Sequence, residues 1–340
     1  MKTLIVSAFA LLMCPIQLIG QTTQDSDQLW CEYQPEENAN GKKIVLVAGD
    51  DEYRSEEALP MLGKILSQRH GYHCTVLFPI DPQTKTIHPG YQKNIPGMQH
   101  LADADLVIIG LRFRALPDDQ MKHFDDYMMS GKPLIALRTS THAFRFQNDT
   151  ESSYRHYDFR GNEKWPRGFG KQVLGETWFN HHGAHGSQST RAVINQEQAD
   201  SVTLKGVDDV WGPTDVYGVR ELPAGTEVLL WGQVLEGMEP DSKPLEGEKN
   251  DPMMALAWIR NWTGPSGNTS PIFCTTMGSS TDFESEDLRR LIVNAAYHMT
   301  DRTEEITDSL NVDYVDEYKP TNFGFGSFQK NKRPSDYNLK

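Results

Sequence analysis

Short apolar runs alternate with longer amphipathic stretches in the first half of the chain. Four of the runs are rich in β-branched residues and short enough for strands buried on both faces: residues 43–49, 73–78, 104–111 and 133–137. Two helices are predicted, one ending at Gly71 and one running from Pro117 to Gly131. The order strand, helix, strand, strand, helix, strand indicates parallel crossovers and therefore a doubly wound α/β sheet.

The second half of the chain predicts further strands and one more helix. Strand-like runs occur at residues 190–195, 215–223, 226–235, 254–260 and 272–277. Residues 284–299 have the periodicity of an amphipathic helix. These elements would extend or cover the sheet, so residues 43–300 are predicted to form one domain. A polar loop, residues 21–42, precedes it, and a tail, residues 301–340, wraps its surface or extends freely.

The first 20 residues have the order of a secretory signal peptide. One lysine precedes an apolar run, and small or polar residues follow at Gly20 and Gln21. A membrane-spanning helix needs roughly 20 apolar residues, and Pro15 and Gln17 interrupt this run. The protein is therefore predicted to be secreted or periplasmic, with no segment inserted in a membrane.

Charge and cysteine content narrow the possible partners. The chain has 33 Lys and Arg against 47 Asp and Glu, a net charge of −14, which disfavours nucleic acids and anionic membranes as partners. Beyond the predicted signal peptide stand Cys31, Cys74 and Cys274, so at most one internal disulfide can form. The sequence leaves open whether any two of them pair.

Charged and hydroxyl side chains gather where the predicted strands end. Ligands of doubly wound sheets bind beyond the carboxyl ends of the strands. Carboxylates after the first strand can bind sugar hydroxyls, or they can complement the dipole of the helix that follows. Two of the candidates lie two residues apart in one strand-like run and would face the same side. The candidates for a ligand cleft are Asp51, Glu52, Arg112, Arg138, His142, Asp215, Tyr217 and Ser279.

The segment HHGAHG, with His181, His182 and His185, brings three imidazoles together. Neutral imidazoles are common ligands of zinc, and closely spaced histidines with a distant carboxylate can complete a divalent-metal site. The same side chains can instead bind substrate hydroxyls or transfer protons in a polar pocket. They can also simply cap a loop. The sequence leaves all three interpretations open.

Four stretches carry a resemblance to a known family: KIVLVAGDDEYRSEE, GKPLIALRTSTHAF, VLGETWFNHHGAHG and FCTTMGSSTDFESEDLRRLIVNAAYHM. In their residues and in their order along the chain, these stretches resemble the ThuA-like domain family, of the trehalose-utilisation type. The resemblance covers residues 43–300. It implies the class I glutamine amidotransferase-like fold, a flavodoxin-like α/β fold with a parallel sheet and helices on both faces, here with a C-terminal extension.

The same comparison places Arg138 where amidotransferases carry their catalytic cysteine and where ThuA-like relatives commonly have a histidine. An arginine stays protonated and cannot attack an acyl carbon, so glutamine amidotransferase chemistry by a thiolate is excluded. Arg138 can clamp an anion or sugar oxygens, or neutralise the acidic residues 50–52. Ser140 or Thr139 can act as nucleophile with His142 as base, although hydroxyl groups in turns usually cap the backbone.

The resemblance implies a role in carbohydrate catabolism. The expected substrates are small carbohydrates, above all 3-keto-glycosides of the kind that a partner sugar dehydrogenase makes. A ketone acidifies the neighbouring C–H bond, so the glycosidic oxygen can leave by lyase or hydrolase chemistry, given a general base and a group that stabilises the enolate. On this interpretation His181 or His182 is the base and Arg138 stabilises the enolate.

Two other classes of function stay open. The chain can be a non-catalytic carbohydrate-binding or scaffold protein that keeps the fold without a nucleophile. It can also be a metal-dependent hydrolase, with zinc or a similar divalent ion held by His181, His182 and His185. The sequence requires no other cofactor and is compatible with a homo-oligomer.

Overall fold

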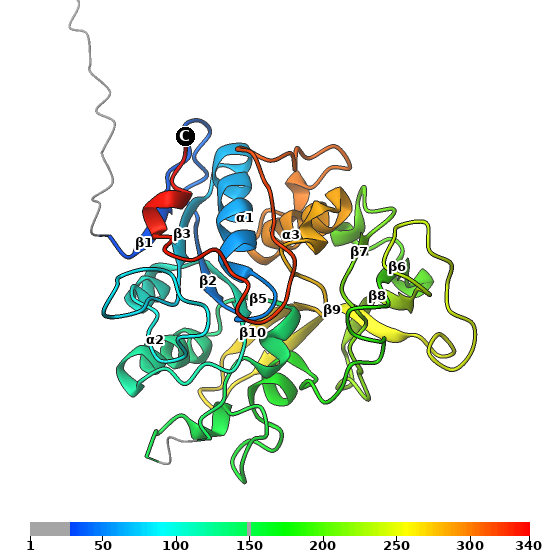
Figure 1. Cartoon of the computed structure of the whole chain (residues 1–340), viewed down its shortest axis with the longest axis horizontal. Helices are drawn as coiled ribbons and strands as arrows, with labels where there is room; N and C mark the ends of the chain where they lie inside the picture. The colour runs from blue at the N-terminus through cyan, green and yellow to red at the C-terminus, as the bar shows by residue number, and fades with distance from the viewer. Residues whose placement is uncertain (1–27, 148–150) are drawn as a thin grey trace, which may run out of the picture.

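A ten-stranded sheet forms the centre of the computed structural model, which describes residues 28–147 and 151–340 (Figure 1). The predicted signal peptide, residues 1–20, lies outside the described residues. The strand order is β1-β3-β2-β4-β5-β10-β9-β8-β6-β7. The strands are Trp30–Tyr33 (β1), Lys43–Gly49 (β2), His73–Leu77 (β3), Leu106–Leu111 (β4), Leu134–Leu137 (β5), Thr190–Ile194 (β6), Trp211–Gly212 (β7), Glu227–Val234 (β8), Met254–Thr263 (β9) and Thr269–Thr275 (β10).

The sheet is mixed, which corrects the expectation of a parallel sheet. Strands β3, β2, β4, β5 and β10 are parallel. Numbered 1 to 5 along the chain, they lie across the sheet in the order 2-1-3-4-5, which is the order of flavodoxin-like sheets. Strand β1 pairs antiparallel at one edge, and β9, β8, β6 and β7 extend the other edge antiparallel. Residues 264–268 are all that join β9 to β10, too short a link for the crossover that parallel strands need.

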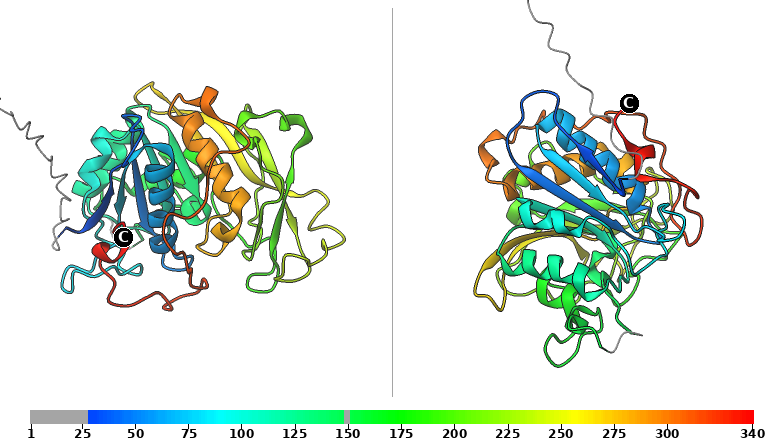
Figure 2. Two further views of the ribbon diagram at one scale, coloured as in Figure 1. Left: turned by 90° about the horizontal axis from the view of Figure 1, so that it is seen from above. Right: turned by 90° about the vertical axis from the view of Figure 1, so that its left-hand side faces the viewer.

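Three α-helices of the described chain lie on the two faces of the sheet: Ser55–His70 (α1), Asp118–Met129 (α2) and Glu286–Met299 (α3). Helices α1 and α3 cover one face and α2 the other (Figure 2). Alternate residues of β2 serve the two faces, because side chains of a strand alternate. Ile44 and Leu46 pack in the cluster under α1 and α3, whereas Val45 and Val47 pack in the cluster under α2.

Two stretches differ from the sequence-based prediction. Within the predicted loop 21–42, Trp30–Tyr33 form the edge strand β1, whose Cys31 and Tyr33 are buried. The predicted strand 215–223 is irregular, apart from an isolated bridge between Tyr217 and His181. Its backbone pairs with the histidine loop instead of the sheet: Val216 accepts hydrogen bonds from the N–H groups of residues 182 and 183.

The tail, residues 301–340, wraps the domain and crosses α1 to end beside β1 (Figure 1). Ile306 and Val312 are buried in the core under α3. Farther along, the hydroxyl of Tyr33 donates to the carbonyl oxygen of Tyr337 at 2.8 Å. The tail therefore belongs to the folded domain.

The described cysteines do not pair. Cys31, Cys74 and Cys274 are all buried free thiols. Across the two described ranges, no helix has both the length and the apolar character needed to cross a bilayer.

Glu56 in the first turn of α1 is a buried carboxyl group without a neutralising contact. Neither of its oxygens has a hydrogen-bond partner within the described residues. Burial raises the pKa of Glu56 from 4.5 to about 8. The folded state therefore holds a proton that the unfolded chain releases above pH 4.5. Stability contributed by this proton is lost as the pH rises towards 8.

We expect Glu56→Gln to leave the free energy of unfolding unchanged near pH 4 and to raise it by up to about 4 kcal/mol at pH 8. Urea denaturation at both pH values measures the difference. Glu57→Gln is the matched control, because Glu57 is a neighbouring buried carboxyl group whose oxygens, unlike those of Glu56, accept hydrogen bonds, from the N–H and hydroxyl of Thr321 at 2.7 Å. A gain for Glu56→Gln that does not vary with pH would contradict the assignment.

Candidate functional site

The carboxyl ends of β2, β4 and β5 bring three chain segments to one edge of the sheet. Residues 50–54 follow β2, residues 112–114 follow β4 and residues 138–142 follow β5. The chain order reverses between β2 and β4, and ligands of open α/β sheets bind at such a switch point. The histidine loop, residues 181–185, and residues 214–218 pack against the same edge.

Arg138 occupies the sharp turn after β5, with a positive φ of 38°. Its guanidinium is enclosed: Nη1 donates to the carbonyl oxygens of Asp215 (3.1 Å) and Thr276 (2.7 Å). Nη2 donates to Asp215 Oδ1 (3.1 Å) and to the hydroxyl of Tyr53 (3.2 Å). The rings of Tyr53 and Tyr217 also pack against it, each with its centroid 4.2 Å from the guanidinium carbon. With the residue only 1% exposed, the guanidinium of Arg138 faces protein groups, which argues against the clamp and the enolate-stabilising role that the sequence suggested.

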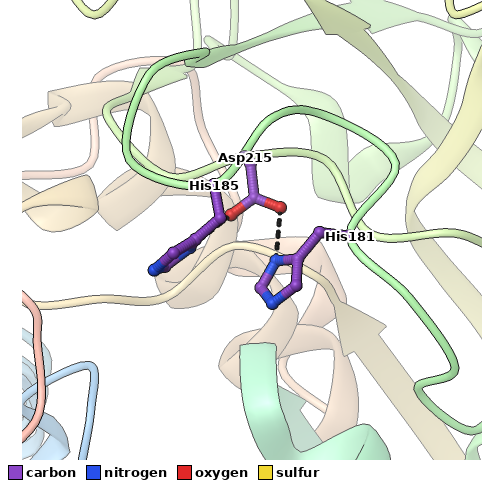
Figure 3. A group of neighbouring side chains, drawn as sticks. All are labelled: His181, His185 and Asp215. Carbon is purple, nitrogen blue, oxygen red and sulfur yellow. Dashed lines mark hydrogen bonds and ion pairs between the residues drawn. The ribbon is translucent and has the colours of Figure 1, made fainter.

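The buried carboxylate of Asp215 contacts Arg138 and two histidines. Figure 3 shows it with His181 and His185. Its Oδ2 lies 2.7 Å from His181 Nδ1, and its Oδ1 lies 3.1 Å from His185 Nδ1. Burial on its own would raise the pKa of Asp215, but the hydrogen bond with His181 and the charge of Arg138 outweigh it and lower the pKa. Asp215 is therefore an anion.

His181 is held as one tautomer by this contact. A carboxylate only accepts hydrogen bonds, so Nδ1 of His181 carries the proton and Nε2 is the basic nitrogen. Figure 3 shows Nε2 on the side of the ring away from Asp215. The side chain is 31% exposed, and the rings of Trp178 and Tyr217 stand edge-on to it at 5.7 and 5.4 Å. A base positioned in this way can take a proton from a bound ligand.

His185 has a carboxylate near each ring nitrogen. Nδ1 faces Asp215, and Nε2 lies 3.5 Å from Oε1 of Glu52. Burial raises the pKa of Glu52, against the lowering effect of the Arg112 charge. The ring centroids of His185 and His181 are 4.7 Å apart, so both rings can reach one small ligand. Each of the two rings therefore has the Asp215 carboxylate at its Nδ1 atom.

The same group is also a candidate divalent-metal site. His181, His185 and Asp215 each offer a ligand atom, and these atoms lie within 4.8 Å of one another. Two imidazoles and a carboxylate suit zinc or iron. His182 is not part of the group, which corrects the predicted ligand set: its Nε2 lies 2.8 Å from the carbonyl oxygen of Lys249. A cation would compete with Arg138 and with both hydrogen bonds for the Asp215 carboxylate.

The acidic residues of the loop after β2 have two different environments. Asp50 is buried and accepts hydrogen bonds from two backbone N–H groups of its own loop and from the Thr139 hydroxyl. Asp51 and Glu52 instead pair with Arg112, at 2.8 Å to Nη1 and 3.3 Å to Nε. The structure thus brings three predicted residues, Asp51, Glu52 and Arg112, together on the rim of the histidine group.

His142 lies behind the site. Its ring packs between Phe113 and Trp178, with centroids 4.9 and 5.1 Å away. Burial, helped by nearby positive charges, lowers the pKa of His142 well below 6.5, so the ring is neutral. The Ser140 hydroxyl donates to the Ile109 carbonyl at 3.0 Å, and Thr139 binds Asp50. The structure therefore forms no Ser140–His142 or Thr139–His142 pair.

Of the predicted cleft residues Ser279 and Tyr217, only Tyr217 lies at the histidine group. Ser279 is buried in the turn after β10, where its hydroxyl accepts a hydrogen bond from the Asp282 N–H at 3.0 Å. It does not face the histidines. Tyr217 does reach the site, although an irregular segment places it there in place of the predicted strand.

Sequence reasoning missed Tyr53 and Phe323. The Tyr53 hydroxyl lies 3.4 Å from His185 Nδ1, and the Phe323 ring lies 5.5 Å from the His185 ring. Tyr53 stands in the loop that was already a candidate, so its position was a usable signal. Phe323 lies in the tail, where only the aromatic and glycine-rich composition of NFGFGSF hinted at a role.

The described cysteines all lie in buried strand positions. Cys31, Cys74 and Cys274 lie in strands β1, β3 and β10, and burial raises the pKa of each thiol. None of these described cysteines stands at the turn after β5.

A separate cavity of about 190 Å³ between α1 and the tail, lined by Pro60 and Tyr337 among others, includes no member of the histidine group.

No family model matches the chain, and no curated protein matches it. Among solved structures, a protein from Parabacteroides merdae described as ThuA-like matches with a TM-score of 0.49 and 13% identity, over 88% of this chain and 99% of that chain. A second one, from Bacteroides uniformis, matches with a TM-score of 0.46 and 12% identity, over 81% and 98%. PurLQS from Thermotoga maritima matches with a TM-score of 0.39 and 11% identity, over 76% and 99%.

These identities and TM-scores say nothing about function, which depends on the side chains of the site.

Proposed function

We propose that the protein binds a small carbohydrate at the carboxyl edge of its sheet and transfers protons on it through His181 and His185. The observation that carries the proposal is the 2.7 Å contact between His181 Nδ1 and the buried carboxylate of Asp215. A carboxylate in this position orients the imidazole and stabilises its protonated form, as in other His–Asp pairs. His185, with Asp215 and Glu52 at its two nitrogens, is placed to return the proton.

The surroundings of the pair favour a neutral, hydroxyl-rich ligand. Asp51, Glu52 and Arg112 offer charged acceptors and donors that are already paired with one another, and the half-buried ring of Trp178 adds aromatic surface. The net charge of −14 disfavours polyanionic ligands. The resemblance to the trehalose-utilisation type of ThuA-like proteins points to the same class of ligand.

For a 3-keto-glycoside, the finer form of the proposal is an elimination. His181 Nε2 takes the proton from C2, between the ketone at C3 and the anomeric carbon, and the C–H electron pair forms an enolate. The enolate collapses to the enone as the bond from C1 to the glycosidic oxygen breaks. The leaving oxygen takes a proton from His185, which gives an unsaturated keto sugar and a free alcohol. Addition of water to the enone would complete a hydrolysis.

We assign stabilisation of the enolate to Arg112 and not to Arg138, the residue that the sequence suggested. Arg138 is enclosed and acts as a positioning residue for Asp215. Arg112, whose side chain is 15% exposed at the rim, is the arginine that a ligand at this edge can reach. Export through the predicted signal peptide, supply of the ketone by a partner sugar dehydrogenase, and assembly into a homo-oligomer belong to the same proposal.

We expect residues 21–340 to release the alcohol from 3-keto-glucosides and not from the matched glucosides. His181→Gln is expected to lower kcat by about 10²–10⁴, because it removes the general base. His182→Gln is the matched control from the same loop, since its ring binds the Lys249 carbonyl outside the group, and it should keep full turnover. Release of the chromogenic alcohol measures both.

Equal losses in the His181 and His182 variants would contradict the assigned base. Absence of release from every glycoside, together with direct sugar binding, would identify a non-catalytic carbohydrate-binding protein instead.

We also expect turnover to survive dialysis against a chelator. Asp215 is already neutralised by Arg138 and bound to both histidines, so the proton-transfer site is complete without a metal ion. Metal content by mass spectrometry and kcat before and after dialysis are the measurements. A loss of turnover that added Zn²⁺ restores would favour the metal-dependent hydrolase, with His181, His185 and Asp215 as ligands.

A further inference from the structure

We propose that residues 321–329, called here the rim segment, form one wall of the ligand site, and that Phe325 stacks against a second ring of the ligand. The inference rests on the proposed function and narrows its substrate class. It assigns a binding role to a part of the tail that lies far from the histidine loop in the sequence.

The rim segment is tied to the loop after β2. Glu57 accepts hydrogen bonds from the N–H and the hydroxyl of Thr321, both at 2.7 Å. In the middle, the N–H of Gly324 donates to the carbonyl oxygen of Glu52 at 2.8 Å, and the buried guanidinium of Arg54 donates to the Gly324 carbonyl. Because these bonds reach Glu52, the rim segment is fixed relative to the carboxylate that contacts His185.

The two phenylalanines of the rim segment face different surroundings. Phe323 packs against Tyr53 at 5.4 Å and against His185 at 5.5 Å. Phe325 is 63% exposed, and no other large hydrophobic side chain in the described ranges stands out as exposed. Gly324 and Gly326, with φ of 137° and 72°, take backbone conformations that other residues rarely adopt. The chain can therefore turn sharply on both sides of Phe325.

Phe325 is connected to the proton-transfer group through the rim. Its ring centroid lies 4.8 Å from the guanidinium carbon of Arg112, which pairs with Asp51 and with Glu52. Glu52 in turn contacts His185. An exposed ring beside a guanidinium and two carboxylates offers an apolar face for C–H groups and polar partners for hydroxyl groups.

The spacing assigns Phe325 to a part of the ligand that does not react. Phe325 contacts Arg112, Arg112 contacts Glu52, and Glu52 contacts His185, so we assign the histidines and Phe325 to different rings of the ligand. The structure thus points to glycosides whose leaving group is itself a ring, and not to glycosides of small alcohols.

The test compares methyl and 4-nitrophenyl 3-keto-glucosides with the wild-type chain, Phe325→Ala and Phe325→Tyr. We expect Phe325→Ala to raise KM for the 4-nitrophenyl compound about tenfold and to leave KM for the methyl compound unchanged, since only the 4-nitrophenyl compound has a second ring. Phe325→Tyr keeps an aromatic face and should restore the wild-type KM. Thermal unfolding of each variant checks that the rim segment still docks.

Calorimetric binding of the unoxidised methyl and 4-nitrophenyl glucosides, both anomers, separates this inference from the proposed function. Turnover with an unchanged KM in Phe325→Ala, or an equal rise for both compounds, would overturn the role of Phe325 and leave the proton-transfer proposal standing. Binding that Phe325→Ala weakens, without turnover in the wild-type chain, would support the wall and overturn the proton transfer. Absence of both binding and turnover would overturn both.

Discussion

The buried ion pair between Arg138 and Asp215 is the contact on which the site depends. Both side chains are almost fully enclosed, and burying a charge costs several kcal/mol unless it is paired and hydrogen-bonded. Nη1 and Nη2 of Arg138 both donate to Asp215. Nη1 also donates to the Thr276 carbonyl, and Nη2 also donates to the Tyr53 hydroxyl. The segment that carries Asp215 must therefore pack against the turn after β5. That constraint keeps Asp215 ionised and sets the tautomer of His181.

This constraint also explains how the turn after β5 is used. A sharp strand-to-helix turn can present a nucleophile, and here the strained position, with φ of 38°, carries an arginine that points into the protein. The proposed reacting groups consequently lie outside the turn, in the histidine loop that the arginine helps to hold. Loops carry these candidate groups, and the parallel strands anchor the loops.

Local patterns in the sequence predicted the parallel strands and the three α-helices, because each has its own apolar periodicity. They also marked His181 and Asp215 as candidates. They could not predict that Asp215 meets Arg138, 77 residues away in the chain, or that the run after Asp215 pairs with a loop. The choice of His185 over His182 depends on tertiary hydrogen bonds, since both follow glycine-rich backbone without a fixed helical register. The four residues of β1 were too few for a recognisable alternation.

One carboxylate, Asp215, serves both histidines, so their difference has to come from elsewhere. His181 meets Asp215 and aromatic edges, whereas His185 meets Asp215 and also Glu52. Glu52 therefore faces Nε2 of His185, whereas no carboxylate of the described residues pairs with Nε2 of His181. Glu52 is fixed by Arg112 and, through its carbonyl, by Gly324 of the tail. The different surroundings of the two neighbouring imidazoles therefore depend on a residue that the C-terminal segment helps to hold in place.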